Sequence, residues 1–149
     1  MILLVDADSL IFSACYRKKL HPEDYPYFTE LQDAVAKFDE VFTSMINDIE
    51  EMYEVDRVIV FNGARGNFRK IITPKYKANR TGAEKPPLLF DLHNYVSKQY
   101  DSINAHGVET DDAVARYWFE ISEVMGRDEV MIVSLDKDYK QFPCLDKDY

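Results

Sequence analysis

Five carboxylates gather in two short stretches of the C-terminal part of the chain. The stretch GVETDDAVA spans residues 107–115, and MIVSLDKDYKQF spans residues 131–142. The acids that they contain are Glu109, Asp111, Asp112, Asp136 and Asp138. Carboxylate oxygens are the ligands that Mg²⁺ and Mn²⁺ prefer, and no set of histidines and cysteines at zinc-ligand spacing accompanies them. The two stretches therefore predict a site for a pair of divalent cations.

A structural explanation accounts for part of this acidity. Thr110 is expected to cap a helix that runs to about Met125, because threonine is a good N-cap residue. Acids in the first turn of a helix each stabilise it by about 0.3–1 kcal/mol. That explains one or two acids better than three, because neighbouring carboxylates repel and raise one another's pKa.

The acids lie at the ends of predicted strands and helices. Largely apolar runs at residues 2–5, 57–61 (which begins with Arg57) and 130–133 predict strands buried on both faces. Helices are expected over residues 10–19, 29–53, 88–100 and 110–125, and DYKQF is expected to begin another. Strands that alternate with helices predict an α/β three-layer domain with a mostly parallel central sheet and right-handed crossovers.

The carboxyl ends of parallel strands meet at one edge of a sheet, where open α/β sheets bind their ligands. Asp6 follows the first strand and Asp136 the third, so these acids are expected to join the group at residues 109–112. For Asp8, helix capping and metal ligation both remain open. The sequence LDKDY occurs at residues 135–139 and 145–149, and the second copy is interpreted as coincidence or as the approach to a terminal strand.

Length and composition exclude several classes of protein. The 149 residues are enough for one domain, and 46% hydrophobic with 30% charged residues is typical of a soluble globular protein. No apolar run approaches the roughly 20 residues of a membrane-spanning helix, and the first residues lack the basic region of a signal peptide. Cys15 and Cys144 have no ligand spacing and indicate free thiols in a reducing, cytoplasmic compartment. His93 is expected to be a packed or surface residue.

Positive charge is concentrated in one segment of an otherwise acidic chain. Residues 64–85 hold seven cations and one acid, whereas the whole chain has a net charge of −9. The segment is rich in glycine and proline, so an irregular loop above the carboxyl edge of the sheet is expected. Such a local concentration of cations is typical of a surface that contacts phosphates.

Several motifs in order carry a resemblance to a known family. VDADS, VFNGARGNFRK, PKYKANR, GVETDDAVA and VSLDKDYKQF together span nearly all of residues 2–142. They resemble the 5′→3′ exonuclease and flap-endonuclease family, closest in pattern to the bacteriophage 5′-exonucleases and the 5′-nuclease domain of bacterial DNA polymerase I. DxD alone is a weak signal, but YKxNR followed by GxExDD, a strand and DKD is a specific one.

The resemblance implies a PIN-like nuclease core, over residues 1–149, that binds two Mg²⁺ ions, with Mn²⁺ as a substitute. Motif matching assigns metal-ligand roles to Asp6, Glu109, Asp111, Asp112, Asp136 and Asp138. The segment at about 64–87 resembles the arch that contacts a single strand, in which Lys77 and Arg80 would assist catalysis. The residues expected to bind nucleic acid are Arg65, Arg69, Lys70, Lys75, Tyr76, Lys77 and Arg80.

The implied partner is DNA with 5′ ends or flaps, or an RNA–DNA hybrid. The resemblance also implies a monomer that acts in DNA replication or repair in a bacterial or phage-infected cell.

Two departures from the family pattern are evident. Asn62 stands where the family has Asp at the end of the second strand, and an uncharged amide would hold a metal less tightly. The family's helical DNA-binding module is expected to be absent from residues 1–149.

Two other functions are compatible with parts of the sequence. Haloacid-dehalogenase-like phosphatases also begin with an apolar strand and DxD; Asp6 would be the nucleophile, Asp8 the general acid and Ser134 a later strand-end residue. YKANR has no place in that scheme, and a trapped phosphoaspartate at Asp6 would support it. The other alternative is a non-catalytic module that binds flap or single-stranded DNA, disabled by Asn62 and truncation.

Overall fold

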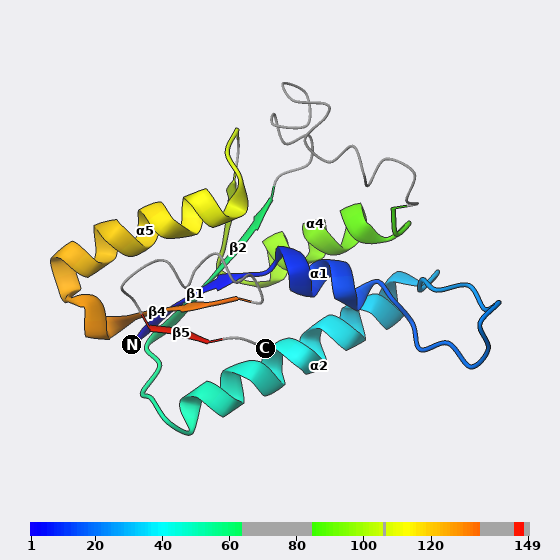
Figure 1. Ribbon diagram of the computed structural model, residues 1–149, viewed down its shortest axis with the longest axis horizontal. Helices are drawn as coiled ribbons and strands as arrows, with labels where there is room; N and C mark the ends of the chain where they lie inside the picture. Colours follow the sequence, from blue (N-terminus) through cyan, green and yellow to red (C-terminus); the bar gives the residue numbers. More distant parts are fainter. Residues whose placement is uncertain (64–84, 106, 135–144, 148–149) are drawn as a thin grey trace.

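The computed structural model describes residues 1–63, 85–105, 107–134 and 145–147. They form a five-stranded sheet in the order β3-β2-β1-β4-β5, with helices on both faces (Figure 1). The strands are β1 (Ile2–Asp6), β2 (Arg57–Gly63), β3 (Ser102–Ala105), β4 (Val130–Val133) and β5 (Leu145–Lys147). All four strand pairings are parallel, which confirms the predicted α/β architecture.

The helices and the short 3-10 turn are α1 (Asp8–Ala14), α2 (Leu31–Glu50), α4 (Leu89–Gln99), α5 (Thr110–Met125) and η2 (Arg127–Glu129). The expected ranges of α4 and α5 agree with the structure to within a residue or so. The expected range of α2 was two to three residues too long at each end, where helix boundaries are least defined. The basic segment at 64–84 and the helix expected to begin at DYKQF lie outside the described residues.

Helix α1 is shorter than the expected range of 10–19. It ends at Ala14 because the chain then turns to form an antiparallel bridge between Tyr16 and Tyr27. Backbone hydrogen bonds from Arg17 N–H to the Pro26 carbonyl, at 2.8 Å, and from Phe28 N–H to the Cys15 carbonyl, also at 2.8 Å, hold this turn. The pairing of residues 15–17 with 26–28 replaces the helical bonds that the apolar spacing alone would predict.

Two strands were not predicted. β3 has the sequence SINA, which is too short for a periodicity to be visible, and it pairs with β2. β5 is formed by the second copy of LDKDY and pairs with β4. Coincidence and the approach to a terminal strand were both left open for this copy, and its first three residues are themselves the strand.

The core lies in two layers, one on each face of the sheet. Helices α1, α2 and α4 cover one face, where Leu3, Val5 and Val60 pack against Phe38 and other residues of these helices. Helix α5 covers the opposite face, where the buried strand residues are Leu4, Ile59, Phe61, Val130 and Ile132, and the helix residues are Val114 and Trp118. The alternation of neighbouring residues between the two faces is the two-residue period of a strand.

A polar contact ties α2 to α4 beside this core. Asp39 accepts hydrogen bonds from the hydroxyls of Tyr95, at 2.7 Å, and Tyr100, at 2.5 Å. Burial and, to a smaller extent, the hydrogen bond to Asp39 raise the pKa of Tyr95 to about 12.

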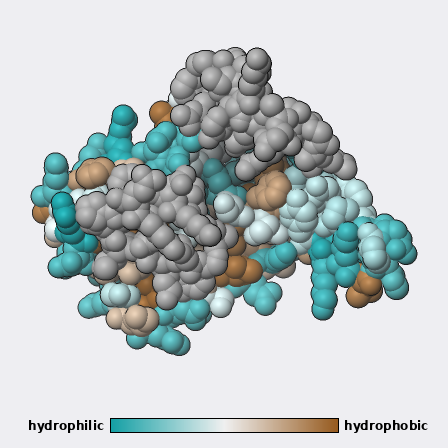
Figure 2. Space-filling view, viewed as in Figure 1, coloured by the Kyte–Doolittle hydropathy of each residue, from teal (hydrophilic) through white to brown (hydrophobic). Residues whose placement is uncertain are grey.

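The face of the molecule in Figure 2 is mostly hydrophilic, with hydrophobic residues in small groups. No helix of the described residues is long and apolar enough to cross a membrane.

Candidate metal centre

The carboxyl ends of the central strands bring the predicted acidic segments to one edge of the sheet. β1 ends at Asp6, which pairs in register with Phe61 of β2. On its other side, Val5 pairs with Val133, the last residue of β4. Helix α5 begins at this edge and packs along β1, β2 and β4. The parallel topology therefore places the N-terminus of α5 near the ends of three strands.

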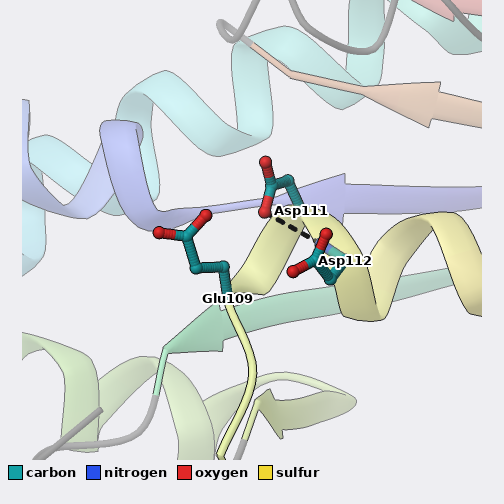
Figure 3. Close-up of side chains that lie close together, drawn as sticks. All are labelled: Glu109, Asp111 and Asp112. Atoms are coloured by element: carbon teal, nitrogen blue, oxygen red, sulfur yellow. Dashed lines mark hydrogen bonds between the residues drawn. The ribbon is translucent and has the colours of Figure 1, made fainter. Parts of the chain in front are cut away.

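Three carboxylates form a cluster at the start of α5. One oxygen from each of Glu109, Asp111 and Asp112 lies within 4.8 Å of the others. Figure 3 shows these three side chains at the start of the helix. Glu109 has an extended backbone in the N-cap position, and the two aspartates belong to the first turn. The Asp112 N–H donates a 2.9 Å hydrogen bond to Asp111 Oδ1. Because like charges this close repel, a bound cation would stabilise the cluster.

The expected capping role of Thr110 is wrong. Thr110 is the first helical residue of α5, Glu109 occupies the N-cap position, and no side chain caps the helix. The Thr110 side chain is buried, and its hydroxyl donates a 2.5 Å hydrogen bond to Asp8 Oδ2. Thr110 does not cap because it lies inside the helix, and its O–H donates instead to a charged acceptor from another segment.

Asp8 does not cap α1, and its other expected role, metal ligation, stays a prediction. Ala7 holds the N-cap position of α1, and no side chain caps this helix. One carboxylate oxygen of Asp8 accepts the Thr110 hydroxyl, and the other accepts the Gly63 N–H at 2.8 Å. Its own N–H donates to Asp6 Oδ1 at 3.2 Å. No local sequence signal identifies these partners, because Thr110 is 102 residues away.

Asn62 lies at the same edge but its side chain is bonded elsewhere. It is only 1% exposed, and its Nδ2 donates to Ser97 Oγ at 3.2 Å. The Ser97 hydroxyl lies 2.9 Å from Asn104 Oδ1 and 3.0 Å from the His93 carbonyl, both possible acceptors. This polar group on α4, β2 and β3 was not predicted, because the helix surface of α4 gave no sign that Ser97 faces the end of a strand.

His93 of α4 belongs to the same region. It is half-buried, and its Nδ1 has no hydrogen-bond partner among the described residues. Burial lowers the pKa of His93, and the negative charge of Asp8 opposes that shift. The imidazole is therefore uncharged near neutral pH and does not neutralise the acids of the site.

Of the other site residues expected from the sequence, the structure describes Asp6 and Asn62. Asp6 is half-buried at the end of β1. Asp136, Asp138 and the basic residues at 65–80 lie outside the described residues. The structure thus assembles the three acids of α5 into a cluster and brings Asp6 and Asn62 to the same sheet edge.

Comparison with known proteins gives the family. Residues 1–146 match the family model for the 5′-3′ exonuclease N-terminal resolvase-like domain. The chain belongs to this family. The resemblance inferred from the motifs is confirmed, and the phosphatase interpretation gains no support from the match.

Solved structures of bacteriophage T5 proteins share the fold of this 5′-3′ exonuclease domain. A T5 flap endonuclease complex with DNA and metal ions is 21% identical with a TM-score of 0.56, and covers 93% of this chain and 50% of that one. A T5 5′-exonuclease with bound zinc is 22% identical with a TM-score of 0.57, again with 93% and 50% coverage. This chain therefore spans about half the length of the proteins that it matches.

Proposed function

We propose that this protein is the catalytic core of a divalent-metal-dependent 5′→3′ nuclease that hydrolyses phosphodiester bonds of DNA. The observation that carries the proposal is the cluster of Glu109, Asp111 and Asp112, with oxygens within 4.8 Å of one another, at the start of α5. Its position at the carboxyl edge of the sheet is where α/β folds bind ligands. The family match and the DNA and metal ions of the T5 complex support the same function.

The donor set fits hard divalent cations, because all the donor atoms are carboxylate oxygens. We assign the metal-holding role to the α5 cluster together with Asp6, Asp136 and Asp138. Two bound Mg²⁺ or Mn²⁺ ions would supply an activated water and neutralise charge on the scissile phosphate. The role of the acids would be to hold these cations at the carboxyl edge of the sheet.

The basic segment at about 64–87 would hold the nucleic acid. Lys77 and Arg80 are assigned to the scissile phosphate, whose developing negative charge they would stabilise. The other cations of the segment would hold the backbone of the strand, and Tyr76 would stack on a base. The proposed substrates are DNA 5′ ends, flaps or RNA–DNA hybrids, bound by a monomer in the cytoplasm of a bacterial or phage-infected cell.

The test is cleavage of a DNA flap that carries a label at its 5′ end. We expect Mg²⁺ or Mn²⁺ to support release of labelled product, and EDTA to abolish it, because the acids would then hold no cation. Ca²⁺ is a matched control, since it is also bound by carboxylates but takes more ligands in a looser geometry. Binding of the flap without any product in Mg²⁺ or Mn²⁺ would contradict the nuclease and support the DNA-binding module. Product in EDTA would contradict the metal requirement.

Asn62 is the observation that favours a weakened metal centre. Asn62→Asp adds a negative charge one residue beyond the Asp6 and Phe61 pair. We expect Mn²⁺ affinity to rise about tenfold, and cleavage with it, because an attraction of only ~1.4 kcal/mol suffices. Without metal, the free energy of unfolding should fall by about 1–3 kcal/mol, because the buried side chain loses its donor to Ser97 and gains a charge.

The matched control is Asn104→Asp. Asn104 pairs in register with Asn62 on β3, one strand farther from β1, and is exposed. It should change Mn²⁺ affinity much less, because distance and solvent weaken the added charge. Titration calorimetry with Mn²⁺ measures both variants. Equal affinities for the two variants would remove position 62 from the metal centre.

A further inference from the structure

The carboxylate of Asp8 joins three segments that are far apart in the sequence. Its Oδ1 accepts the Gly63 N–H at 2.8 Å, at the end of β2, and its Oδ2 accepts the Thr110 hydroxyl at 2.5 Å, at the start of α5. Asp8 itself opens α1 directly after β1. A single side chain therefore connects β1, β2 and α5 at the edge of the sheet that carries the acids.

The junction is closely packed, with Asp8 and Gly63 half-buried and Thr110 buried. Thr110 is only 5% exposed. A Cβ on Gly63 would lie 3.3 Å from Asp8 Oδ2 and 3.3 Å from Thr110 Oγ1, so the absence of a side chain at position 63 leaves room for the contact. Hydrogen bonds to a charged acceptor are stronger than neutral ones, and the loss of one partner inside a packed structure leaves the other unsatisfied.

The sequence position of Thr110 connects this junction to the acidic cluster. Thr110 stands in the sequence between Glu109 and Asp111, and Asp112 follows in the same turn. The three carboxylates repel one another, and the first turn of a helix is its least stable part. An anchored Thr110 fixes the backbone on both sides, so that the three oxygens stay close enough for one cation.

We propose that Asp8 is a positioning residue of the metal centre, which holds the acidic first turn of α5 against β2 through Thr110 and Gly63. Asp8 acts on the cluster through the Thr110 hydroxyl and on β2 through the Gly63 N–H, both of which it accepts. The inference rests on the proposed function for its effect on cleavage, but its effects on metal affinity and on helix order are separate.

The test compares Thr110→Val, which removes the hydroxyl at nearly constant shape, with Thr110→Ser, which keeps it. Mn²⁺ alone is the probe, measured by titration calorimetry, and amide hydrogen exchange at residues 110–113 is measured without metal. We expect Thr110→Val to weaken Mn²⁺ binding about tenfold and to accelerate exchange in this turn, with α4 unchanged. Thr110→Ser should keep most of the Mn²⁺ affinity and most of the protection from exchange in this turn. Thr43→Val, on the exposed side of α2, is the matched control and should change neither.

Asp8→Asn supplies a second approach, because an amide has only one acceptor oxygen for the two donors. The double variant Asp8→Asn with Thr110→Val should bind Mn²⁺ no more weakly than the weaker-binding single variant. Both substitutions act on the same hydrogen bond between Thr110 and Asp8, so their effects should not add. Wild-type affinity and exchange in Thr110→Val, or fully additive losses in the double variant, would overturn the proposal. If these effects occur but the parent protein does not cleave DNA, only the proposed function fails.

Discussion

Asp112→Ala is expected to reduce metal-dependent cleavage of a 5′-labelled flap by at least about 100-fold, since loss even of an outer partner of a metal ligand reduces activity 10–100-fold. The variant removes one of the three oxygens of the cluster and one negative charge that would hold the cation. Mn²⁺ affinity should fall with the cleavage rate. The side chain is exposed and supports the helix mainly through its charge near the first turn. The free energy of unfolding should therefore change by only about 0.3–1 kcal/mol.

The matched control for this variant is Asp91→Ala. Asp91 is an exposed aspartate in the first turn of α4, so the substitution removes the same charge from the same helical position. It should leave cleavage and Mn²⁺ affinity at the parent values while changing stability to a similar small extent. Undiminished cleavage by Asp112→Ala, measured as initial rates in saturating Mg²⁺, would remove Asp112 from the metal centre.

The sequence was sufficient to predict the central strands and the acidic turn because both depend on local patterns. The run at β1 is continuously apolar, and a strand with helices on both faces has no solvated side to interrupt it. The cluster of Glu109, Asp111 and Asp112 is equally local, since its members lie within four consecutive residues. The carboxyl edge then followed from the parallel topology.

The contacts that support the site could not be predicted from such patterns. Thr110 was predicted to cap α5, and capping and metal ligation were both open for Asp8, whereas in the structure the two side chains bond to each other. Ser97 gave no signal on the helix surface of α4, although it is the partner of Asn62. A capping residue and a residue that bridges distant segments have the same side-chain chemistry, so only the tertiary arrangement distinguishes them.

These unpredicted contacts share a physical feature. Each connects a polar side chain at, or two residues beyond, the end of a strand to a helix that packs on one of the two faces of the sheet. Asp8 reaches α5 on one face, and Asn62 reaches α4 on the other. The acidic edge is therefore supported from both layers. A change in either layer is expected to alter the geometry of the carboxylates without changing their number.

The second large effect is expected at Trp118, which holds α5 against the sheet. Trp118 is 1% exposed and packs with Leu4, Ile59 and Phe61 in the core under α5. Trp118→Ala should lower the free energy of unfolding by about 3–5 kcal/mol, a large part of the 5–15 kcal/mol typical of a domain. Urea denaturation followed by circular dichroism measures this. The control is Phe119→Ala, the neighbouring aromatic residue, which is 46% exposed and should lose much less.

Metal binding distinguishes the stabilising role of Trp118 from the proposed ligand role of Asp112. A cation that binds only the folded state stabilises it by about 2.7 kcal/mol when its concentration is 100 times the dissociation constant. Trp118→Ala keeps all three carboxylates, so saturating Mn²⁺ should raise its unfolding free energy by about the same increment as in the parent. Asp112→Ala should lose most of that increment while starting from nearly parental stability. If Trp118→Ala remained folded but lost the increment, the packing of α5 would itself set the geometry of the carboxylates, and the Asp8 junction alone would not be sufficient to hold them.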